Sequence, residues 1–426
     1  MLEPGVVRIG HTRSGESAAD EVIVAEFDGE GVLVTWPRAL GFVEAFQLND
    51  SIKVPEPLIF RDGSGWFTLA EGRSHGASAS TNGHSEQRLR YSRAVQSGSN
   101  GIDWAEVNGM TSEVDGLATW TKRVPATTKL QFDESHSRID SVSVIAKNLD
   151  SLSLGGPLDL RLETSYTHNP KPKNGQFAIS TALLVRTHTA DLVEWSSHRQ
   201  THRMIQDLMC LVYGRPCFSR LVSAMREDDQ EIELTDHRRM WRDSYEPGFG
   251  RAIAESASRE DSQRPLFYMD EADELRIAKW LTEYSYWARP TWIAMTALFD
   301  SDLPAESILL QVAVALEALG YAIAKRADPS AVVKDTYEQL LRRIFNELGY
   351  LPAAVVGPTA SANEWCKSFN AAYKGVKHAD NPLTDALHAY ERGREGLRLI
   401  RCWLAAELGV SSEIVTTRFR EGRVGV

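Results

Sequence analysis

The segment ASANEWCKSFNAAYKGVK, residues 360–377, decides the fold of the C-terminal part of the chain. Four apolar side chains in it fall at i, i+4, i+7 and i+11: Trp365, Phe369, Ala372 and Val376. This spacing is typical of one apolar stripe along an α-helix, and such a stripe must face a core. The segment therefore predicts a helix that packs against other helices.

Three neighbouring segments carry similar helical patterns, at residues 304–326, 331–348 and 383–408. The region of Gly349 and the sequence Asp380-Asn381-Pro382 supply the stops between them. Four helices within about a hundred residues predict a compact four-helix bundle over residues 304–426. Upstream, residues 190–213 and 271–298 are also helical in pattern, so we expect residues 190–303 to form a helical connecting region.

The first 189 residues have the pattern of short strands and turns. The runs EVIVAEF (21–27) and VLVTW (32–36) flank Asp28-Gly29-Glu30-Gly31, which predicts a hairpin. Further short runs rich in β-branched and aromatic residues follow, and their spacing favours a sandwich or a barrel. The small polar stretch 72–87 indicates a surface loop. The expected fold is therefore α+β and multidomain, an antiparallel β-sandwich-like domain (1–189) followed by an all-α region.

Composition limits the classes of function. The chain has 426 residues and a net charge of −11, which excludes a protein that coats nucleic acid, although a local basic patch could still grip it. No apolar run is long enough to span a membrane and no signal peptide is evident, so no membrane contact is expected. Cys210, Cys217, Cys366 and Cys402 are too scattered for a disulfide framework. They predict buried free thiols and a cytoplasmic location.

Candidate chemistry lies on the other side of the helix at 360–377. Asn370, Lys374, Lys377 and His378 all project away from the apolar stripe and gather at the C-terminal end of the helix. A histidine can both accept and donate a proton near neutral pH, and a nearby lysine can stabilise a phosphate or an oxyanion. Cations in the last turn of a helix also complement its dipole, so simple helix capping is the alternative explanation.

The stretch FNAAYKGVKHADNP (369–382) resembles the signature region of HEPN domains, which are four-helix bundles of prokaryotic defence and toxin systems. The whole chain resembles the ApeA-like branch, in which a β domain precedes a HEPN bundle. LQVAVALEALGYAI (310–323) is similar to the first bundle helix of that family and places Glu317 at its acidic position. VDGLATWTKR (114–123) resembles a tryptophan-bearing segment of the N-terminal domain.

The resemblance implies a metal-independent ribonuclease in which an arginine and a histidine assist attack by a ribose 2′-hydroxyl, with two protomers forming the site. His378 matches the family histidine. No arginine stands at the matching positions, which hold Ala371, Ala372 and Tyr373. Lys374 and Lys377 are the candidate substitutes, although lysine lacks the guanidinium fork.

His198 and His202 are spaced i, i+4, which can suit zinc, but no third ligand is evident and solvated polar residues are the favoured interpretation. No cofactor motif is found. Two hypotheses remain open. The first is a HEPN endoribonuclease in anti-phage defence by abortive infection, a homodimer acting on RNA, whose β domain senses a phage-derived or protein trigger. The second is a catalytically inactive HEPN dimerisation module joined to a ligand-recognising β domain.

Overall fold

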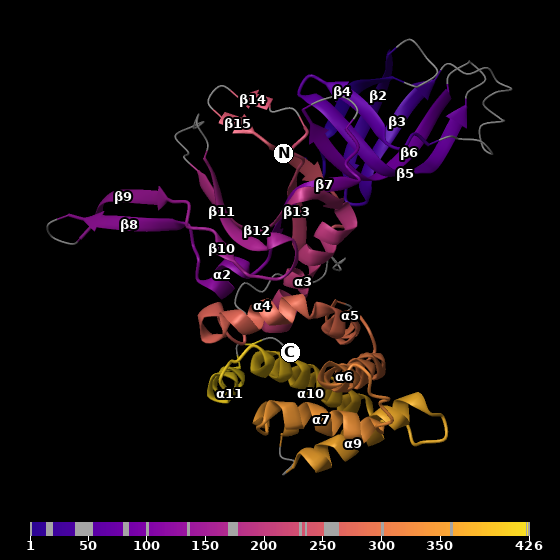
Figure 1. Ribbon diagram of the computed structural model, residues 1–426, viewed down its shortest axis with the longest axis vertical. Coiled ribbons are helices and arrows are strands. Elements are labelled where there is room, and N and C mark those ends of the chain that lie inside the picture. Colours follow the sequence, from indigo (N-terminus) through magenta and orange to yellow (C-terminus); the bar gives the residue numbers. More distant parts are fainter. Residues whose placement is uncertain are drawn as a thin grey trace. The chain divides into compact units, whose positions relative to one another are not determined.

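A computed structural model describes residues 2–13, 20–38, 54–79, 85–98, 102–133, 137–168, 178–229, 232–234, 237–250, 264–299, 302–357, 361–422 and 424. The chain divides into two compact units that interleave along the sequence. Unit 1 comprises residues 1–113, 185–203 and 219–251, and unit 2 comprises residues 114–184, 204–218 and 252–426. Figure 1 shows the elements of both units, coloured along the sequence.

Unit 1 contains a closed β-barrel. Its six strands are β1 (Val7–Arg13), β2 (Asp20–Asp28), β3 (Gly31–Arg38), β4 (Leu58–Asp62), β5 (Gly65–Ala79) and β6 (Ser85–Ser97). They pair antiparallel in the order β6-β3-β2-β1-β4-β5, and β5 pairs with β6 to close the ring. Closure removes the exposed edges that an open sheet would present. The β-rich N-terminal part is thus confirmed, but it is barrel-like and not a sandwich.

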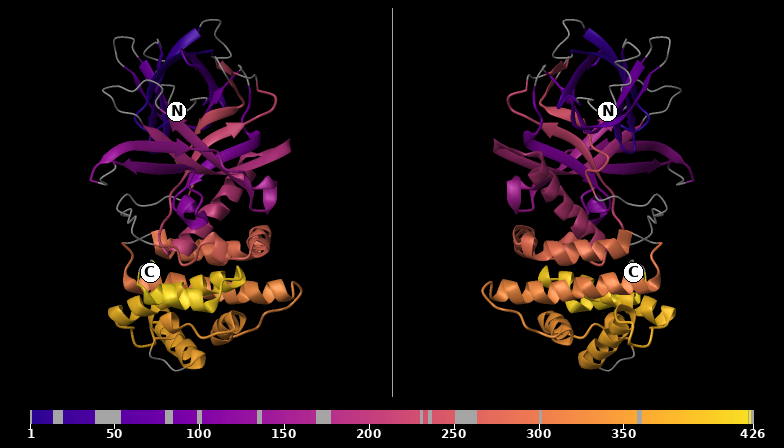
Figure 2. Two further views of the ribbon diagram at one scale, coloured as in Figure 1. Left: turned by 90° about the vertical axis from the view of Figure 1, so that its left-hand side faces the viewer. Right: turned by 90° about the vertical axis from the view of Figure 1, so that its right-hand side faces the viewer.

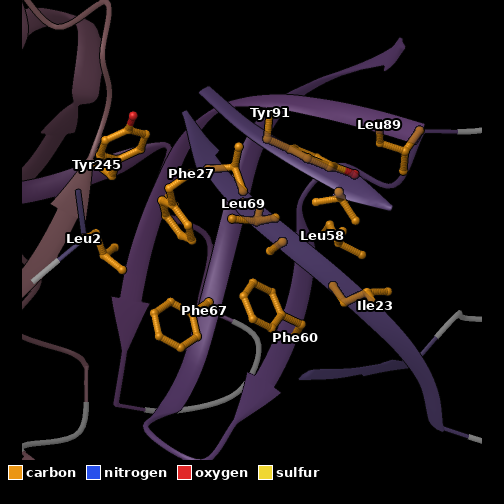
Figure 3. Packing of buried hydrophobic residues seen from close by; sticks show 14 of the residues in the cluster. Leu2, Ile23, Phe27, Leu58, Phe60, Phe67, Leu69, Leu89, Tyr91 and Tyr245 are labelled. Atoms are coloured by element: carbon orange, nitrogen blue, oxygen red, sulfur yellow. The ribbon is translucent and has the colours of Figure 1, made fainter. Parts of the chain in front are cut away.

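Alternation along the strands fills the barrel with large apolar side chains. Figure 3 shows Phe27, Phe60, Phe67, Leu69 and Tyr91 pointing into a common core, and all five are fully buried. Rings of Phe60 and Phe67 stack with centroids 5.0 Å apart. Inward positions therefore recur at every second residue, which is the period that the sequence runs display.

The small polar stretch 72–87, expected to be a loop, is largely strand. Residues 72–79 belong to β5 and residues 85–87 to β6, and residues 80–84 lie outside the described part. The loop prediction was wrong because pairing with β6 satisfies the backbone of a segment whose small side chains carry no strand signal of their own. A register shift between Ser74 and Gly76 bends the strand.

Strands also occur after residue 190, where we expected only helix. β12 (Ile179–Glu194) runs past residue 190 and leads directly into helix α3 (Trp195–Tyr213), whereas β7 (Glu106–Val114) lies earlier in the chain. β13 (Ser219–Met225), β14 (Ile232–Leu234), β15 (His237–Arg239) and β16 (Trp241–Tyr245) come next. β16 pairs with β13 and with β6 of the barrel, so these residues return to unit 1. The charged residues in this region hide the alternating pattern typical of a strand, so the strands can be recognised only from their pairing.

Helices dominate unit 2. They are α2 (Leu117–Thr121), η2 (Pro157–Asp159), η3 (Met269–Glu271), α4 (Glu274–Thr282), α5 (Tyr284–Phe299), α6 (Ala305–Ala327), α7 (Tyr337–Leu348), α8 (Ala353–Val356), α9 (Ala362–Lys377), α10 (Ala386–Glu407) and α11 (Ser412–Arg420). The helical C-terminal region is therefore confirmed. α6, α7, α9 and α10 pack against one another, as the orange to yellow helices of Figure 2 show.

Two close contacts hold the C-terminal helices of unit 2. Gly320 on α6 lies so near α7 that an added Cβ would come within 2.7 Å of the Leu340 carbonyl oxygen. Arg401 on α10 is buried and donates hydrogen bonds to the carbonyls of Leu211 and Val212, at the C-terminal end of α3. These carbonyls have no partner within their own helix, and a cation there also complements the helix dipole.

Among the described residues, α6 is long and apolar enough to cross a membrane by composition. However, 56% of its most apolar window is buried inside the structure, as expected of a core helix.

Unit 2 also contains strands. β10 (Leu152–Ser153) pairs with β11 (Arg161–His168). β8 (Ala126–Phe132) and β9 (Ile139–Ala146) form a separate two-stranded sheet.

Candidate functional site

Helix α9 carries most of the residues singled out by the sequence. Ser361 caps its start by accepting a hydrogen bond from the Glu364 N–H, and His378 ends it by donating its own N–H to the Lys374 carbonyl at 2.9 Å. Trp365 and Phe369 are fully buried, as predicted, whereas Val376 is only half-buried. The apolar stripe therefore faces the core of the packed helices.

Asn370 does not lie on an exposed polar stripe. It is 7% exposed and its Nδ2 donates to Glu338 Oε1 on α7 at 3.0 Å. The Oδ1 atom is buried and has no hydrogen-bond partner among the described residues. The expectation from one helical wheel failed because α7 covers a second side of α9, so that the buried surface of α9 is wider than its apolar stripe.

Tyr373 is likewise buried, and it organises a small cluster. Its ring lies 4.9 Å from the ring of Tyr337 on α7, and its hydroxyl accepts a hydrogen bond from Lys377 Nζ at 2.9 Å. This hydrogen bond raises the pKa of Lys377, and the carboxylate of Glu317 contributes in the same direction. Glu317 lies exposed on α6. The structure thus brings together three predicted residues from two helices.

Burial raises the pKa of the Tyr337 phenol well above its usual value, and the neighbouring Tyr373 and Glu317 add to this effect. The Tyr337 hydroxyl donates to the Ala313 carbonyl at 3.1 Å. Both observations indicate that the Tyr337 phenol is neutral. It packs against Tyr373 and takes no part in proton transfer near neutral pH.

Lys374 and His378 form the exposed part of the site. Both side chains are exposed, and they are four residues apart at the C-terminal end of α9. The same end carries Lys377, so two ammonium groups and an imidazole face solvent within one helical turn. Lys374 and Lys377 lie in the last turn of α9, and His378 follows as the C-cap residue with an extended backbone. This arrangement can bind a phosphate and can place a proton donor or acceptor beside it.

Sequence reasoning missed three residues of α7 that border the site: Tyr337, Glu338 and Arg342. Glu338 accepts from Asn370 through one oxygen and from Arg342 Nη2, at 3.2 Å, through the other. A guanidinium therefore approaches α9 from a neighbouring helix, although α9 carries no arginine. The capping box of Thr336 and Gln339 marks the start of α7 in the sequence, but the contact with α9 has no local signal.

His198 and His202 are buried in unit 1, which corrects the expectation of solvated side chains. His198 Nε2 lies 3.3 Å from the Val107 carbonyl, which can only accept, so His198 Nδ1 accepts from the Thr187 hydroxyl at 2.7 Å. The Thr187 oxygen then accepts from His202 Nε2 at 3.0 Å, and the Ser112 hydroxyl donates to His202 Nδ1 at 2.6 Å. Every nitrogen is used within the protein.

Burial lowers the pKa of His198 to about 4 and that of His202 to about 3, so both rings are neutral at pH 7. Across the described ranges, no group of three or more His, Cys, Asp or Glu side chains is placed to hold a metal ion. The four cysteines are buried and free, as predicted. The histidine pair is therefore a hydrogen-bonded part of the core of unit 1.

A model of the family described as ApeA N-terminal domain 1 matches residues 26–280, more than half of the chain. The match begins in β2, runs past residue 189 and ends in α4, before the candidate site on α9. Neither the comparison with curated proteins nor that with solved structures gives a match.

Proposed function

The chain belongs to the ApeA N-terminal domain 1 family, which suggests a role in anti-phage defence, and we propose that it acts there as a metal-independent endoribonuclease of the HEPN type. In this proposal the helices α6, α7, α9 and α10 form the HEPN bundle and act on RNA in the cytoplasm. The barrel-containing part senses a phage-derived or protein trigger.

The exposed pair Lys374 and His378 is the observation that carries the proposal. His378 is the acid or base that moves the proton of the ribose 2′-hydroxyl or of the leaving oxygen. Lys374 stabilises the negative charge on the phosphate, the role of the arginine in the family. Lys377, held by Tyr373, adds a second cation whose position is restricted by that hydrogen bond.

Cleavage of single-stranded RNA tests the proposal. We expect cleavage that persists in EDTA and leaves a 2′,3′-cyclic phosphate. His378→Ala is expected to abolish it, Lys374→Ala to reduce it at least tenfold, and Lys374→Arg to retain it, because guanidinium binds phosphate at least as well as ammonium. Lys367→Ala is the matched control, since Lys367 is an exposed lysine nearer the start of the same helix. Equal activity in the wild type, His378→Ala and Lys374→Ala would refute the proposal that the protein is a ribonuclease.

A two-fold dimer of the helical bundle belongs to the same proposal, because the composite site implied by the family needs two copies. Sedimentation analysis at micromolar concentration tests it. A monomer would contradict the nuclease proposal but would not bear on the description of the fold.

A second function has one observation in its favour. Asn370 and Tyr373 are buried and engaged with Glu338 and Lys377, so they are less available to a substrate than an exposed polar stripe would be. A catalytically inactive bundle that holds partners together, joined to a ligand-recognising β domain, would have such interior contacts. The result expected for it is that the wild type, His378→Ala and Lys374→Ala behave alike in the cleavage assay.

A further inference from the structure

Helix α3 is shared by the two compact units. It is one continuous helix of 19 residues (Figure 1), of which residues 195–203 belong to unit 1 and residues 204–213 to unit 2. In an α-helix each N–H donates to the carbonyl four residues earlier, so the N–H groups of residues 204–207 pair with the carbonyls of residues 200–203. Hydrogen bonds within one helix therefore join a segment of unit 1 to a segment of unit 2.

The start of α3 is fixed within unit 1 by a hydrogen-bonded network. The backbone N–H of Trp195 donates to the Ala105 carbonyl at 2.8 Å, and its indole Nε1 donates to Glu246 Oε2 at 2.8 Å. The other oxygen of Glu246 pairs with Arg199 Nη1 at 2.8 Å, one turn further along α3. Trp195 and Glu246 are both buried, so removal of the indole donor leaves a buried carboxylate oxygen without this partner.

The second half of α3 is buried around its whole circumference, since each of residues 204–213 is at most 9% exposed. It nevertheless carries polar side chains, and their partners lie in unit 2. Gln206 Nε2 donates to the Cys217 carbonyl at 2.9 Å, and the Asp207 carboxylate accepts from the Tyr284 hydroxyl. A buried polar group that loses its hydrogen bond is costly, so these bonds favour one position of α3 within unit 2.

Helix α10 binds the end of α3. Arg401 is 1% exposed and donates to the carbonyls of Leu211, at 2.8 Å, and Val212, at 3.0 Å. Six residues earlier on the same helix, Glu395 accepts a hydrogen bond from the indole N–H of Trp365 on α9 at 2.8 Å. One helix therefore contacts both the C-terminal end of α3 and the helix that carries the candidate site.

We propose that α3 couples the stability of unit 1 to that of α10, so that a change which weakens the contacts of α3 in unit 1 also makes α10 open more readily. The physical basis is the cooperativity of a helix. When one turn frays, the next turn loses hydrogen-bond partners, so fraying of one half of α3 lowers the cost of opening the other half. The end of α3 is then a weaker partner for Arg401.

This coupling does not depend on ribonuclease activity. Its regulatory use rests on the proposed function. If the protein is a ribonuclease, α3 and α10 are the route by which a trigger bound by the barrel-containing part acts on α9.

Hydrogen–deuterium exchange of the full chain tests the proposal. Trp195→Phe removes the donor to Glu246 but keeps an aromatic ring, and it is expected to lower the protection of α10 peptides around Arg401 about tenfold. Trp104→Phe is the matched control. Trp104 is buried in the same core cluster of unit 1 and does not lie on α3, and its indole N–H has no hydrogen-bond partner in the described part of the chain.

The control variant is expected to change the protection of α10 by less than about twofold. Equal losses of α10 protection in Trp195→Phe and Trp104→Phe would overturn the proposal, because the loss would then follow the stability of unit 1 and not the attachment of α3. Unchanged α10 protection in Trp195→Phe would overturn it as well.

Coupling between two sites is reciprocal, so a change at the other end of α3 must be felt in unit 1. Arg401→Met removes a donor at the end of α3 and is expected to lower the protection of residues 195–203 several-fold. Arg392→Met is the matched control, because Arg392 lies on the same helix, is largely buried and pairs with Glu395 of that helix. If the loss in Arg401→Met stays confined to α10 and residues 204–213, the coupling is refuted, whatever Trp195→Phe does.

Failure of the coupling and failure of the proposed function are distinguishable, because exchange is measured without RNA. A protein that cleaves no RNA but shows both expected losses of protection would keep the coupling and refute the ribonuclease. An active ribonuclease in which neither variant acts across α3 would refute the coupling alone.

Discussion

Lowering the pH from 7 to 5 should selectively destabilise unit 1, because its core contains two neutral histidines. His198 and His202 are buried, and burial lowers their pKa to about 4 and about 3. In the unfolded chain each has a pKa near 6.5. Between these values the unfolded state binds more protons than the folded state, so stability falls as the pH falls below 6.5.

The size of the loss follows from the same pKa values. One pKa unit corresponds to about 1.4 kcal/mol, and at pH 5 the unfolded histidine lies about 1.5 units above the ambient pH. Each ring therefore costs about 2 kcal/mol between pH 7 and pH 5, and the pair about 4 kcal/mol. Glu246 acts in the opposite direction, because its burial raises the pKa of its carboxyl. The net loss of stability of unit 1 is therefore expected to be smaller than the sum for the two histidines.

Hydrogen–deuterium exchange measures this loss by segment. Protection of peptides from β7, which contains Ser112 and Val107, is expected to fall by two to three orders of magnitude from pH 7 to pH 5, after correction for intrinsic exchange. Helix α7 serves as an internal control, since it contains no histidine. His202→Gln should reduce the loss of stability between pH 7 and pH 5 by about half, because it removes one of the two buried imidazoles.

Two results would refute this reasoning. The first is a change in β7 protection of less than tenfold between the two pH values. The second is an undiminished pH dependence in His202→Gln. Either would mean that the two rings are already protonated in the folded state or are reached by solvent.

Two further perturbations concern the helices of unit 2. Gly320→Ala is expected to lower the free energy of unfolding by about 1–3 kcal/mol, because the new methyl group meets the Leu340 backbone, and thermal unfolding measures it. Arg401→Met is expected to cost about 1–3 kcal/mol, since it removes the donor to the Leu211 carbonyl, whereas the Val212 carbonyl keeps the Leu266 N–H, and urea denaturation measures it. A neutral outcome for Arg401→Met would indicate that desolvation of the guanidinium offsets its hydrogen bonds.

Periodicity alone determined where the C-terminal helices lie. The predicted helix at 360–377 is α9 (Ala362–Lys377), and the one at 304–326 is α6 (Ala305–Ala327). Each has an apolar stripe, and α9 also has a capping serine, Ser361, and these are local features. The burial of Trp365 and Phe369 followed from the same stripe. The cluster of Lys374, Lys377 and His378 at the end of α9 was also readable, because the three residues lie close together in the sequence.

The arrangement of the strands depended on tertiary structure. Closure of the barrel requires β5 and β6 to pair along most of their length, which no strand encodes by itself. The strands after α3 had no clear alternating pattern, and they become strands by pairing with β6 and with each other. Strand pairing is a contact between distant segments, so the local sequence specifies it weakly.

The candidate site shows the same division. The sequence placed Lys374 and His378 on an exposed helix end, and the structure agrees. It also placed Asn370 on that polar face, whereas packing by α7 buries it against Glu338. A helical wheel describes the sides of one helix, but which of those sides are covered depends on how many neighbours the helix has. For α9 that number was set by tertiary packing, because α6, α7 and α10 all contact it.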